Sequence, residues 1–368
     1  MTISADSADY PRILTVATAF PPYHYTQDMM CEYARERILG ADWQANAEQA
    51  ANARLIERLF ASSRVAHRQS ALDLRAYHAE TPTTGARMAT YESAAYALGR
   101  DAMEQAQRQA GNLRDARDIS DFIVVSCTGY SAPGLDIQLA RDLGMPRDVR
   151  RLVVGHMGCF GALVGLRQSL AALRAHPDAT VAMLCVELTT LHFMPSLDPE
   201  VLTSFALFGD AAAVALLGYD ERASGPQVVD TYCAADFATA DQMSWKITDQ
   251  GFVMTLSPRV PVSLRRNILA VMDHLLTPHG LTISDVRHWI IHPGGPSILD
   301  AIQGKLELSD EQMALSWQVL HDHGNCSSAT VLLIVDELLR SGRPNPGDWG
   351  VMMAFGPGLT LETCLLRF

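Results

Sequence analysis

Hydrophobic and polar positions along this chain form blocks that predict strands followed by helices. Segment 121–140, DFIVVSCTGYSAPGLDIQLA, reads as an apolar strand, a Gly/Pro turn and a helix. Region 27–118 instead carries apolar residues at helical spacing, most clearly in ANAEQAANARLIERLF and MATYESAAYALGRDAMEQAQRQAG, and is expected to be largely helical. The pattern as a whole is typical of an α/β protein.

Three pairs of segments occur in the same order, and the two members of each pair share a plan: strand–turn–helix, then a Gly-rich turn before an apolar helix, then a β-rich run. The pairs are 121–140 with 288–302, 152–174 with 321–340, and 179–188 with 348–359. Their members lie roughly 165–170 residues apart, as expected of a duplicated α/β unit. The polar stretch 218–228, GYDERASGPQV, suits a boundary, which predicts two halves, 1–222 and 223–368.

Composition changes this picture little but excludes several classes of protein. Of the 368 residues, 48% are hydrophobic, and no apolar run reaches the length of a membrane span. The start, MTISADSADYPRIL, lacks the features of a secretory signal, so the cytoplasm is the expected compartment. The formal net charge of −12 argues against nucleic acid as a partner. Seven cysteines without CxxC pairs argue against a disulfide framework and a structural zinc site.

Cys159 stands in GHMGCFG, after an apolar run and before a long apolar helix. A thiol at a helix N-terminus meets the positive end of the helix dipole, which is expected to lower its pKa and favour the thiolate. The flanking Gly158 and Gly161 would let a substrate approach the backbone closely. The same setting suits a buried structural cysteine, so these residues alone leave both interpretations open.

His292 and Asn325 are the candidate partners of Cys159. His292 ends the apolar strand HWII, a place where ligands bind open α/β sheets, and a histidine beside a cysteine can act as a base and hold the thiolate as an ion pair. Asn325, in HGNCSSA, could be a helix N-cap, or its amide could donate a hydrogen bond to a thioester carbonyl. Asn325 fills the place in the second repeat that Cys159 fills in the first, so pseudo-symmetry would bring the two together.

Five motifs resemble those of the type III polyketide synthases of the chalcone synthase family, and the similarity runs through nearly the whole chain. The motifs are GHMGCFGAL, LFGDAAA, HPGGPSILD, GNCSSATVLLIVDEL and AFGPGLTLE. The resemblance implies the thiolase fold, a duplicated five-layer αβαβα arrangement. It also implies a homodimer, in which Ala132 would reach toward the partner's cavity.

The resemblance implies a decarboxylative condensation that needs no metal and no organic cofactor. An acyl-CoA starter would load onto Cys159 and be extended repeatedly with malonyl-CoA. His292 and Asn325 would donate hydrogen bonds to the malonyl thioester oxygen, because stabilising the enolate is the main catalytic demand. The chain would then cyclise to a pyrone, a resorcinol or another phenolic.

Two alternatives remain beside this interpretation. Carrier-protein-dependent enzymes similar to β-ketoacyl synthase III, and other acyltransferases of the same fold, also use Cys, His and Asn. Their histidine is typically followed by Gln-Ala-Asn, whereas His292 is followed by Pro-Gly-Gly, which favours the polyketide branch. A non-catalytic acyl-binding subunit is a third candidate, and the presence of all three catalytic residue types argues against it.

The resemblance also assigns residues to the substrate site. Phe208 matches the aromatic gatekeeper between the CoA tunnel and the reaction cavity, and three residues of the matching motifs, Gly294, Gly295 and Pro357, belong to its walls. Arg58 matches one basic residue of the CoA entrance, but Leu55 and Ser62 stand where lysines are expected. Arg64 and Arg68 could supply the missing charge.

Four cavity positions depart from the plant enzymes of the family. Met254 replaces a second phenylalanine gatekeeper, Trp245 a glycine, Cys127 a threonine and His192 a small residue. The bulk of Trp245 should limit the number of extensions. Cys127 resembles the second active-site cysteine of bacterial members that make naphthalene products, although a packing role is equally open. These departures favour a bacterial-type enzyme that makes a small phenolic.

Overall fold

The computed structural model describes residues 10–40, 42–45, 47–111, 115–220 and 222–368. Within these residues, nine strands form one mixed sheet in the order β11-β12-β13-β8-β1-β7-β6-β4-β5. The strands are β1 (Arg12–Ala19), β4 (Asp121–Ser126), β5 (Arg150–Gly155), β6 (Val181–Leu188), β7 (Asp210–Gly218), β8 (Gln227–Ala235), β11 (Val286–Ile291), β12 (Trp349–Gly356) and β13 (Thr360–Arg367).

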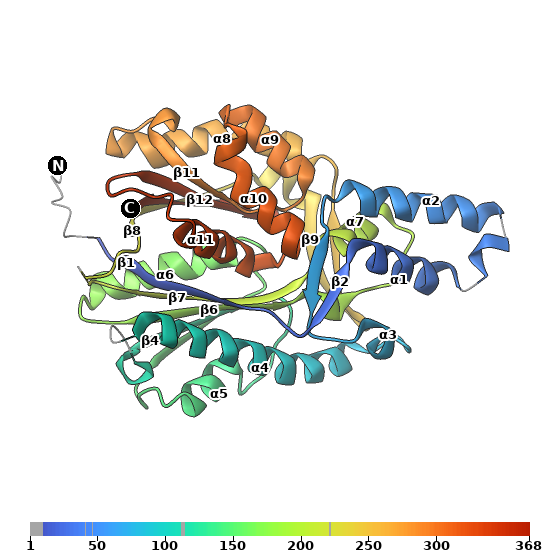
Figure 1. The fold of residues 1–368 in the computed structure, drawn as a ribbon, viewed down its shortest axis with the longest axis horizontal. Helices are drawn as coiled ribbons and strands as arrows, with labels where there is room; N and C mark the ends of the chain where they lie inside the picture. Colours follow the sequence, from blue (N-terminus) through green and yellow to red (C-terminus); the bar gives the residue numbers. More distant parts are fainter. Residues whose placement is uncertain (1–9, 41, 46, 112–114, 221) are drawn as a thin grey trace.

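Helices cover both faces of each half of this sheet, and α1 and α2 protrude beyond it (Figure 1). In chain order the helices are α1 (Gln27–Leu39), α2 (Ala47–Ser62), α3 (Leu74–Tyr77), α4 (Thr84–Ala110), α5 (Leu135–Asp142), α6 (Gly161–Ala175), α7 (Pro199–Leu207), α8 (Val260–Leu276), α9 (Pro296–Leu306), α10 (Asp310–His323) and α11 (Thr330–Arg340). Figure 1 shows the layers in turn: α4 with α5, the β1 half of the sheet, α6 with α11, the β12 half, and α8 with α9. The predicted five-layer αβαβα fold is confirmed.

The order of the strands repeats in the two halves. β4 pairs parallel with β6, and β11 pairs parallel with β12. Antiparallel neighbours then follow, β7 and β1 in one half and β13 and β8 in the other. In the sheet the halves meet where Arg12 pairs with Gln227. The spacing of the sequence repeat therefore reflects a repeated topology.

Burial explains why the middle helices are so apolar. In α11 the five residues 331–335 are all buried, because sheets lie on both sides of this helix. The third hydrophobic core lies between α8, α9 and the β12 half of the sheet. No helix among the described residues is both long and apolar enough to cross a bilayer.

Two short two-stranded sheets lie outside the main sheet. β2 (Tyr23–Thr26) pairs with β3 (His67–Ser70), within the region predicted to be largely helical. β9 (Met243–Thr248) pairs with β10 (Gly251–Leu256), and this pairing sets Met254 directly opposite Trp245. Directly paired residues point to one face of a hairpin, so both side chains are presented together.

Candidate active site

Cys159 lies in the turn between β5 and α6 and is 5% exposed. The preceding Gly158 has φ +79°, and a Cβ there would lie 2.7 Å from Cδ of Pro357, so the turn requires glycine and seats Pro357 beside the nucleophile. Burial raises the pKa of Cys159 to about 12, although contacts with Ser327 and Asn325 act to lower it. The prediction of a lowered thiol pKa is therefore wrong for the resting site, where desolvation outweighs the helix dipole.

The side-chain amide of Asn325 lies 3.9 Å from Sγ of Cys159. Oδ1 of Asn325 accepts a hydrogen bond from the backbone N–H of Ser327 at 2.8 Å, just before the 3-10 helix η8 (Ser327–Ala329). This bond fixes the amide, whose Oδ1 and Nδ2 both lie 3.9 Å from the thiol sulfur. The amide therefore keeps N–H donors within reach of a group bound at Cys159.

His292 follows the last residue of β11 and is fully buried. Neither ring nitrogen has a hydrogen-bond partner among the described residues. Burial lowers the pKa of His292 to about 3, so the imidazole is neutral and retains one N–H donor and one acceptor. With the thiol and the imidazole both neutral, the expected thiolate–imidazolium ion pair is absent from the resting site.

The turn after His292 packs against the segment that holds Asn325. Gly295 has φ +154°, and a Cβ there would lie 3.3 Å from the Leu207 side chain. The carbonyl of Leu207 accepts the backbone N–H of Asn325 at 2.8 Å. The HPGG turn and Asn325 thus contact the same residue.

The space around the nucleophile is small. A cavity of about 20 Å³ is lined by Cys127, Thr128, Gly158, Cys159, Thr189, Phe208, Trp245, Met254, Ser327 and Pro357. A neighbouring cavity of about 30 Å³ includes His192 and shares Thr189, Phe208, Trp245 and Met254 with the first. Cavities of this size hold one or two waters, so the shared side chains must move to admit an acyl chain.

Trp245 and His192 are fixed between these two cavities. The indole Nε1 of Trp245 donates to the carbonyl of Cys127 at 2.7 Å. His192 lies 2.7 Å from the carbonyl of Thr128 through Nε2 and accepts the N–H of Phe252 at 3.0 Å through Nδ1, so the ring carries its proton on Nε2. Both nitrogens of His192 are therefore occupied, and the ring braces the cavity wall.

Cys127 is the topological counterpart of His292, because it follows β4 as His292 follows β11. Its Sγ lies 3.4 Å from Oε1 of Glu187 and 3.2 Å from Oγ of Ser327. Burial raises the pKa of the Cys127 thiol and that of the Glu187 carboxyl. Sequence reasoning did not single out Glu187, although a lone acid in the apolar run ATVAMLCVEL was a usable signal.

Glu187 is fully buried, and its carboxylate accepts hydrogen bonds from several groups at the end of β4 and in η8. The backbone N–H of Cys127 and the hydroxyl of Thr128 donate to it at 3.0 and 2.8 Å, and Ser328 donates through its hydroxyl. These bonds connect the end of β4, in the first repeat, with η8, in the second. Glu187 therefore has a structural role in holding the two repeats together at the site.

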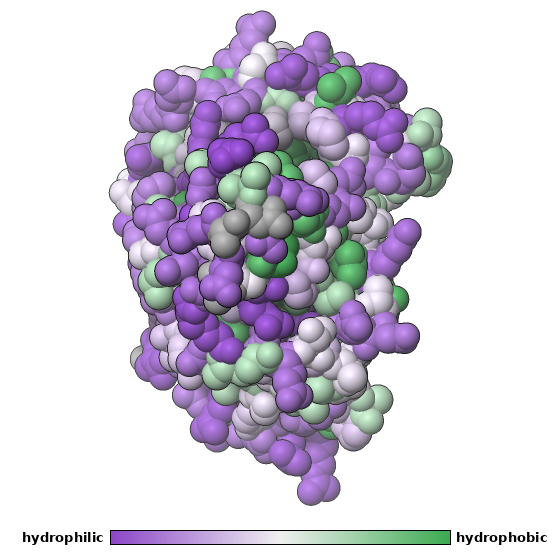
Figure 2. All heavy atoms as spheres, turned by 90° about the vertical axis from the view of Figure 1, so that its right-hand side faces the viewer, coloured by the Kyte–Doolittle hydropathy of each residue, from purple (hydrophilic) through white to green (hydrophobic). Residues whose placement is uncertain are grey.

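A larger cavity of about 480 Å³ adjoins the site from outside. Its lining includes Leu207, Gly294, Gly295 and Arg64, whose guanidinium lies 3.8 Å from Asp300. Arg58 is exposed on α2 and is not among the lining residues. Figure 2, which faces the side where α1 and α2 protrude, shows apolar side chains in a depression within a largely hydrophilic surface.

Arg68 does not contribute charge to this cavity. Its side chain is fully buried and donates to the carbonyls of Phe205, Ala206 and Phe208. The expectation that Arg68 supplies charge for CoA is therefore wrong. Half-buried and buried residues alternate in β3, and Arg68 occupies one of the buried positions, so its side chain points inward.

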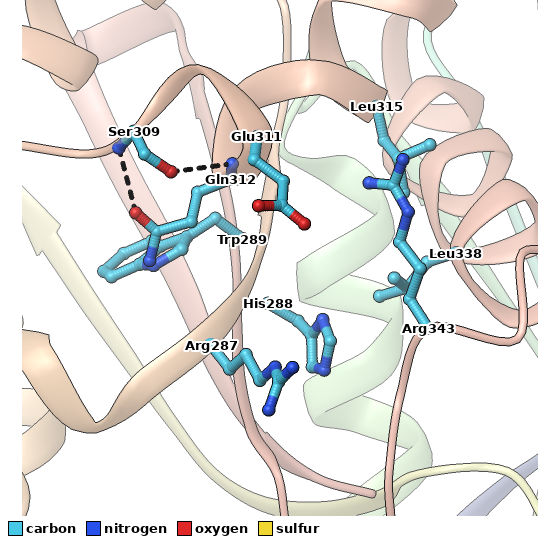
Figure 3. Close-up of a pocket in the computed structure, with 9 residues that line it drawn as sticks. All are labelled: Arg287, His288, Trp289, Ser309, Glu311, Gln312, Leu315, Leu338 and Arg343. Carbon is cyan, nitrogen blue, oxygen red and sulfur yellow. Dashed lines mark hydrogen bonds between the residues drawn. The ribbon is translucent and has the colours of Figure 1, made fainter.

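A separate cavity of about 380 Å³ lies away from the site (Figure 3). It is lined by Arg287, His288, Trp289, Ser309, Glu311, Gln312, Leu315, Leu338 and Arg343. His288 lies 2.9 Å from Oδ2 of Asp348, and Ser309 and Gln312 form the capping box at the start of α10. The polar groups of this cavity largely serve local structure.

Two family models match most of the chain. The N-terminal domain of chalcone and stilbene synthases matches residues 4–221, and the C-terminal domain of the same synthases matches residues 234–368. The 1,3,6,8-tetrahydroxynaphthalene synthase of Streptomyces peucetius subsp. caesius is 36% identical over 360 residues, which cover 97% of this chain and 93% of that protein.

Solved structures of similar proteins agree with these matches. PKS-I from the brown alga Ectocarpus siliculosus superposes with a TM-score of 0.88 at 28% identity, covering 97% of this chain and 98% of that chain. The C-terminal type III polyketide synthase domain of Steely1 from Dictyostelium also gives a TM-score of 0.88, at 25% identity, covering 98% and 99%.

Proposed function

We propose that Cys159 carries the growing polyketide in this protein, which belongs to the chalcone and stilbene synthase family and is a bacterial-type type III polyketide synthase. The observation that supports this assignment is the buried thiol with the Asn325 amide 3.9 Å from its sulfur. His292 adds a buried imidazole without a hydrogen-bond partner among the described residues. The active site would then combine residues of both proposed halves, 1–222 and 223–368.

Loading begins from a neutral thiol and a neutral imidazole. Sγ of Cys159 attacks the carbonyl carbon of an acyl-CoA starter while its proton passes to His292. The carbon–sulfur bond to CoA breaks, and the departing CoA thiolate takes that proton from His292. An acyl-cysteine remains, and His292 is neutral again.

Extension uses the same groups as hydrogen-bond donors. The N–H of His292 and the amide of Asn325 would hold the thioester oxygen of malonyl-CoA. When the carboxylate leaves as carbon dioxide, the electron pair of the broken bond forms an enolate whose oxygen these donors stabilise. The enolate carbon attacks the acyl-cysteine, and Cys159 leaves as a thiolate, takes up a proton and accepts the longer chain for the next round.

We infer a small phenolic product from Cys127, which lines the cavity at Cys159 and resembles the second active-site cysteine of naphthalene-forming members of the family. The Streptomyces relative is a tetrahydroxynaphthalene synthase, whose product is of this class. Trp245 and Met254 close the resting space at Cys159 to about 20 Å³, so these side chains would move when the product forms. CoA would enter through the cavity of about 480 Å³, where the guanidinium of the lining residue Arg64 could bind a phosphate.

The test is to incubate the protein with labelled malonyl-CoA, alone and with octanoyl-CoA. We expect release of carbon dioxide and formation of lactone or phenolic products from free CoA thioesters, without a carrier protein. Formation of product only when malonate is attached to a carrier protein would instead identify the enzyme as a carrier-dependent ketosynthase. If neither carbon dioxide nor product appears, the proposal is wrong.

The assembly we propose is a homodimer formed through β5. On this edge strand the exposed fraction is 42% for Leu152 and 51% for Val153. Successive residues of a strand point to opposite faces of the sheet, so apolar side chains are exposed on both faces of β5. Tyr130 and Met157 are exposed as well, and the strand presents unpaired backbone groups along its outer edge. A second copy would cover these groups and bring Ala132 near the partner's cavity.

A further inference from the structure

Arg68 is a buried cation whose hydrogen-bond acceptors are neutral, although the buried carboxyl of Asp210 also attracts its charge. It lies on β3, is fully buried and makes no ion pair within the part of the chain that the structure describes. Burial lowers the pKa of Arg68 to about 9, so the guanidinium still carries its charge at neutral pH. Desolvating a charge costs free energy, and hydrogen bonds must offset that cost.

Three of the four hydrogen bonds that the Arg68 side chain makes with described residues lie at the C-terminus of α7. Nη1 of Arg68 donates to the carbonyls of Phe205 and Phe208, each at 2.8 Å, and Nη2 donates to that of Ala206 at 2.7 Å. Nη2 also donates to Gln27, the first residue of α1. The last carbonyls of a helix lack partners and form the negative end of its dipole, so a cation is favourable there.

The fourth carbonyl at this end of α7 belongs to Leu207 and accepts a hydrogen bond from Asn325. The backbone N–H of Asn325 donates to Leu207 at 2.8 Å, and its carbonyl accepts the N–H of Gly209 at 3.1 Å. Phe208, between these two bonds, lines both cavities beside Cys159. The segment at the end of α7 therefore carries the gatekeeper Phe208 and also fixes the backbone of Asn325.

The backbone at the end of α7 packs directly against the backbone that precedes Asn325. A Cβ on Gly209 would lie 2.5 Å from the carbonyl of His323 and 3.1 Å from Cβ of Arg68. A Cβ on Gly324 would lie 2.5 Å from the carbonyl of Leu207. Because backbone packs directly on backbone here, a displacement of the end of α7 would be passed to Asn325.

We propose that Arg68 is a positioning residue, which holds the end of α7 so that Phe208 and Asn325 keep their places relative to Cys159. Arg68 touches neither the substrate nor the reacting atoms. The proposal rests on the assigned roles of Cys159 and Asn325. It predicts that loss of Arg68 harms condensation more than acyl loading, since loading requires only the thiol and a base.

The experiment uses the full chain with the substitutions Arg68→Lys and Arg68→Gln. Competent sites are counted by acylation of Cys159 with labelled acyl-CoA, and turnover is expressed per acylated site. We expect condensation per site to fall by about 100-fold, the effect of displacing a catalytic group by about 1 Å. Carbon dioxide released per condensed product should rise, because decarboxylation would no longer be coupled to attack.

Arg87→Gln is the matched control. Arg87 is also fully buried and donates to the carbonyls of Leu191 and Phe193, which flank His192 in the cavity wall and do not hold Asn325. Arg87→Gln should lose comparable stability, and because the Asn325 backbone keeps its bonds to Leu207 and Gly209, the ratio of carbon dioxide to product should stay at the wild-type value. An equal change of this ratio in the Arg87 and Arg68 variants would show a general effect of buried charge and overturn the proposal.

Gln27→Ala gives a milder test if both Arg68 variants fail to fold. It removes one acceptor of the guanidinium, and we expect a smaller change of the ratio in the same direction. An unchanged ratio in a folded Gln27 or Arg68 variant would overturn the positioning role. If the wild-type protein neither acylates Cys159 nor releases carbon dioxide, the proposed function itself fails, which is a different result.

Discussion

At the scale of single residues, burial decides the protonation of the reacting groups. Cys159 starts as a thiol and His292 as a neutral imidazole, because both lie in a desolvated site. The sequence located both side chains, through the glycine-flanked turn and the strand end. It could not predict their protonation, since desolvation depends on residues far apart in the chain.

Cys159→Ala should abolish acyl loading, because no other group assigned to the site replaces the thiol in this step. Mass spectrometry after incubation with an acyl-CoA should show no acyl adduct on this variant. Cys127→Ala is the control and should still acquire one adduct. Full acylation of Cys159→Ala would contradict the assignment of the nucleophile.

The buried imidazole of His192 should make stability depend on pH. Burial lowers its pKa from 6.5 to about 3, so between these values the folded protein binds fewer protons than the unfolded chain. The stabilisation is present above pH 6.5 and falls by about 1.4 kcal/mol per pH unit as the pH drops toward 3.

The variant His192→Gln removes this titration, while a glutamine amide can still accept from Phe252 and donate to Thr128. The free energy of unfolding, measured by chemical denaturation between pH 7 and pH 5, should therefore fall less steeply than in the wild type. Equal slopes in the two proteins would refute the assignment of a neutral buried ring.

At the scale of elements, the β9–β10 hairpin sets the size of the cavity. Trp245→Gly should join the two cavities and lengthen the polyketide by at least one extension, as judged by mass spectrometry of the products. Lys246→Gly is the control, because Lys246 is exposed on the same strand and glycine there costs roughly 0.5–1 kcal/mol of stability relative to alanine. An unchanged product in the Trp245 variant would remove Trp245 from the cavity floor.

The predictability of the elements follows their length and periodicity. The segments 121–140 and 152–174 were read correctly because apolar strands and amphipathic helices leave strong patterns. The pairing of β2 with β3 was missed, since each strand has only four residues and α1 and α2 lie between them in the chain. The inward orientation of Arg68 was missed for a related reason, because its acceptors lie about 140 positions later in the chain.

At the scale of the whole molecule, the exposed edge at β5 predicts the assembly. Val153→Glu should place a charge in the proposed interface and halve the molar mass measured by light scattering at micromolar concentration. Leu269→Glu is the control, because Leu269 is 38% exposed on α8 and lies outside that face. A dimer that survives Val153→Glu, or a wild-type monomer, would contradict this interface.

The five layers around Cys159 also have a consequence for the chemical lifetime of the enzyme. Oxidants and alkylating agents attack thiolates that they can reach, and the resting site offers a protonated sulfur behind Trp245 and Phe208. Burial also raises the pKa of Cys233, to about 11, but Cys233 is exposed and is therefore the more accessible thiol. An idle enzyme would therefore accumulate oxidative damage at its surface first, while its nucleophile becomes vulnerable mainly when a substrate opens the cavity.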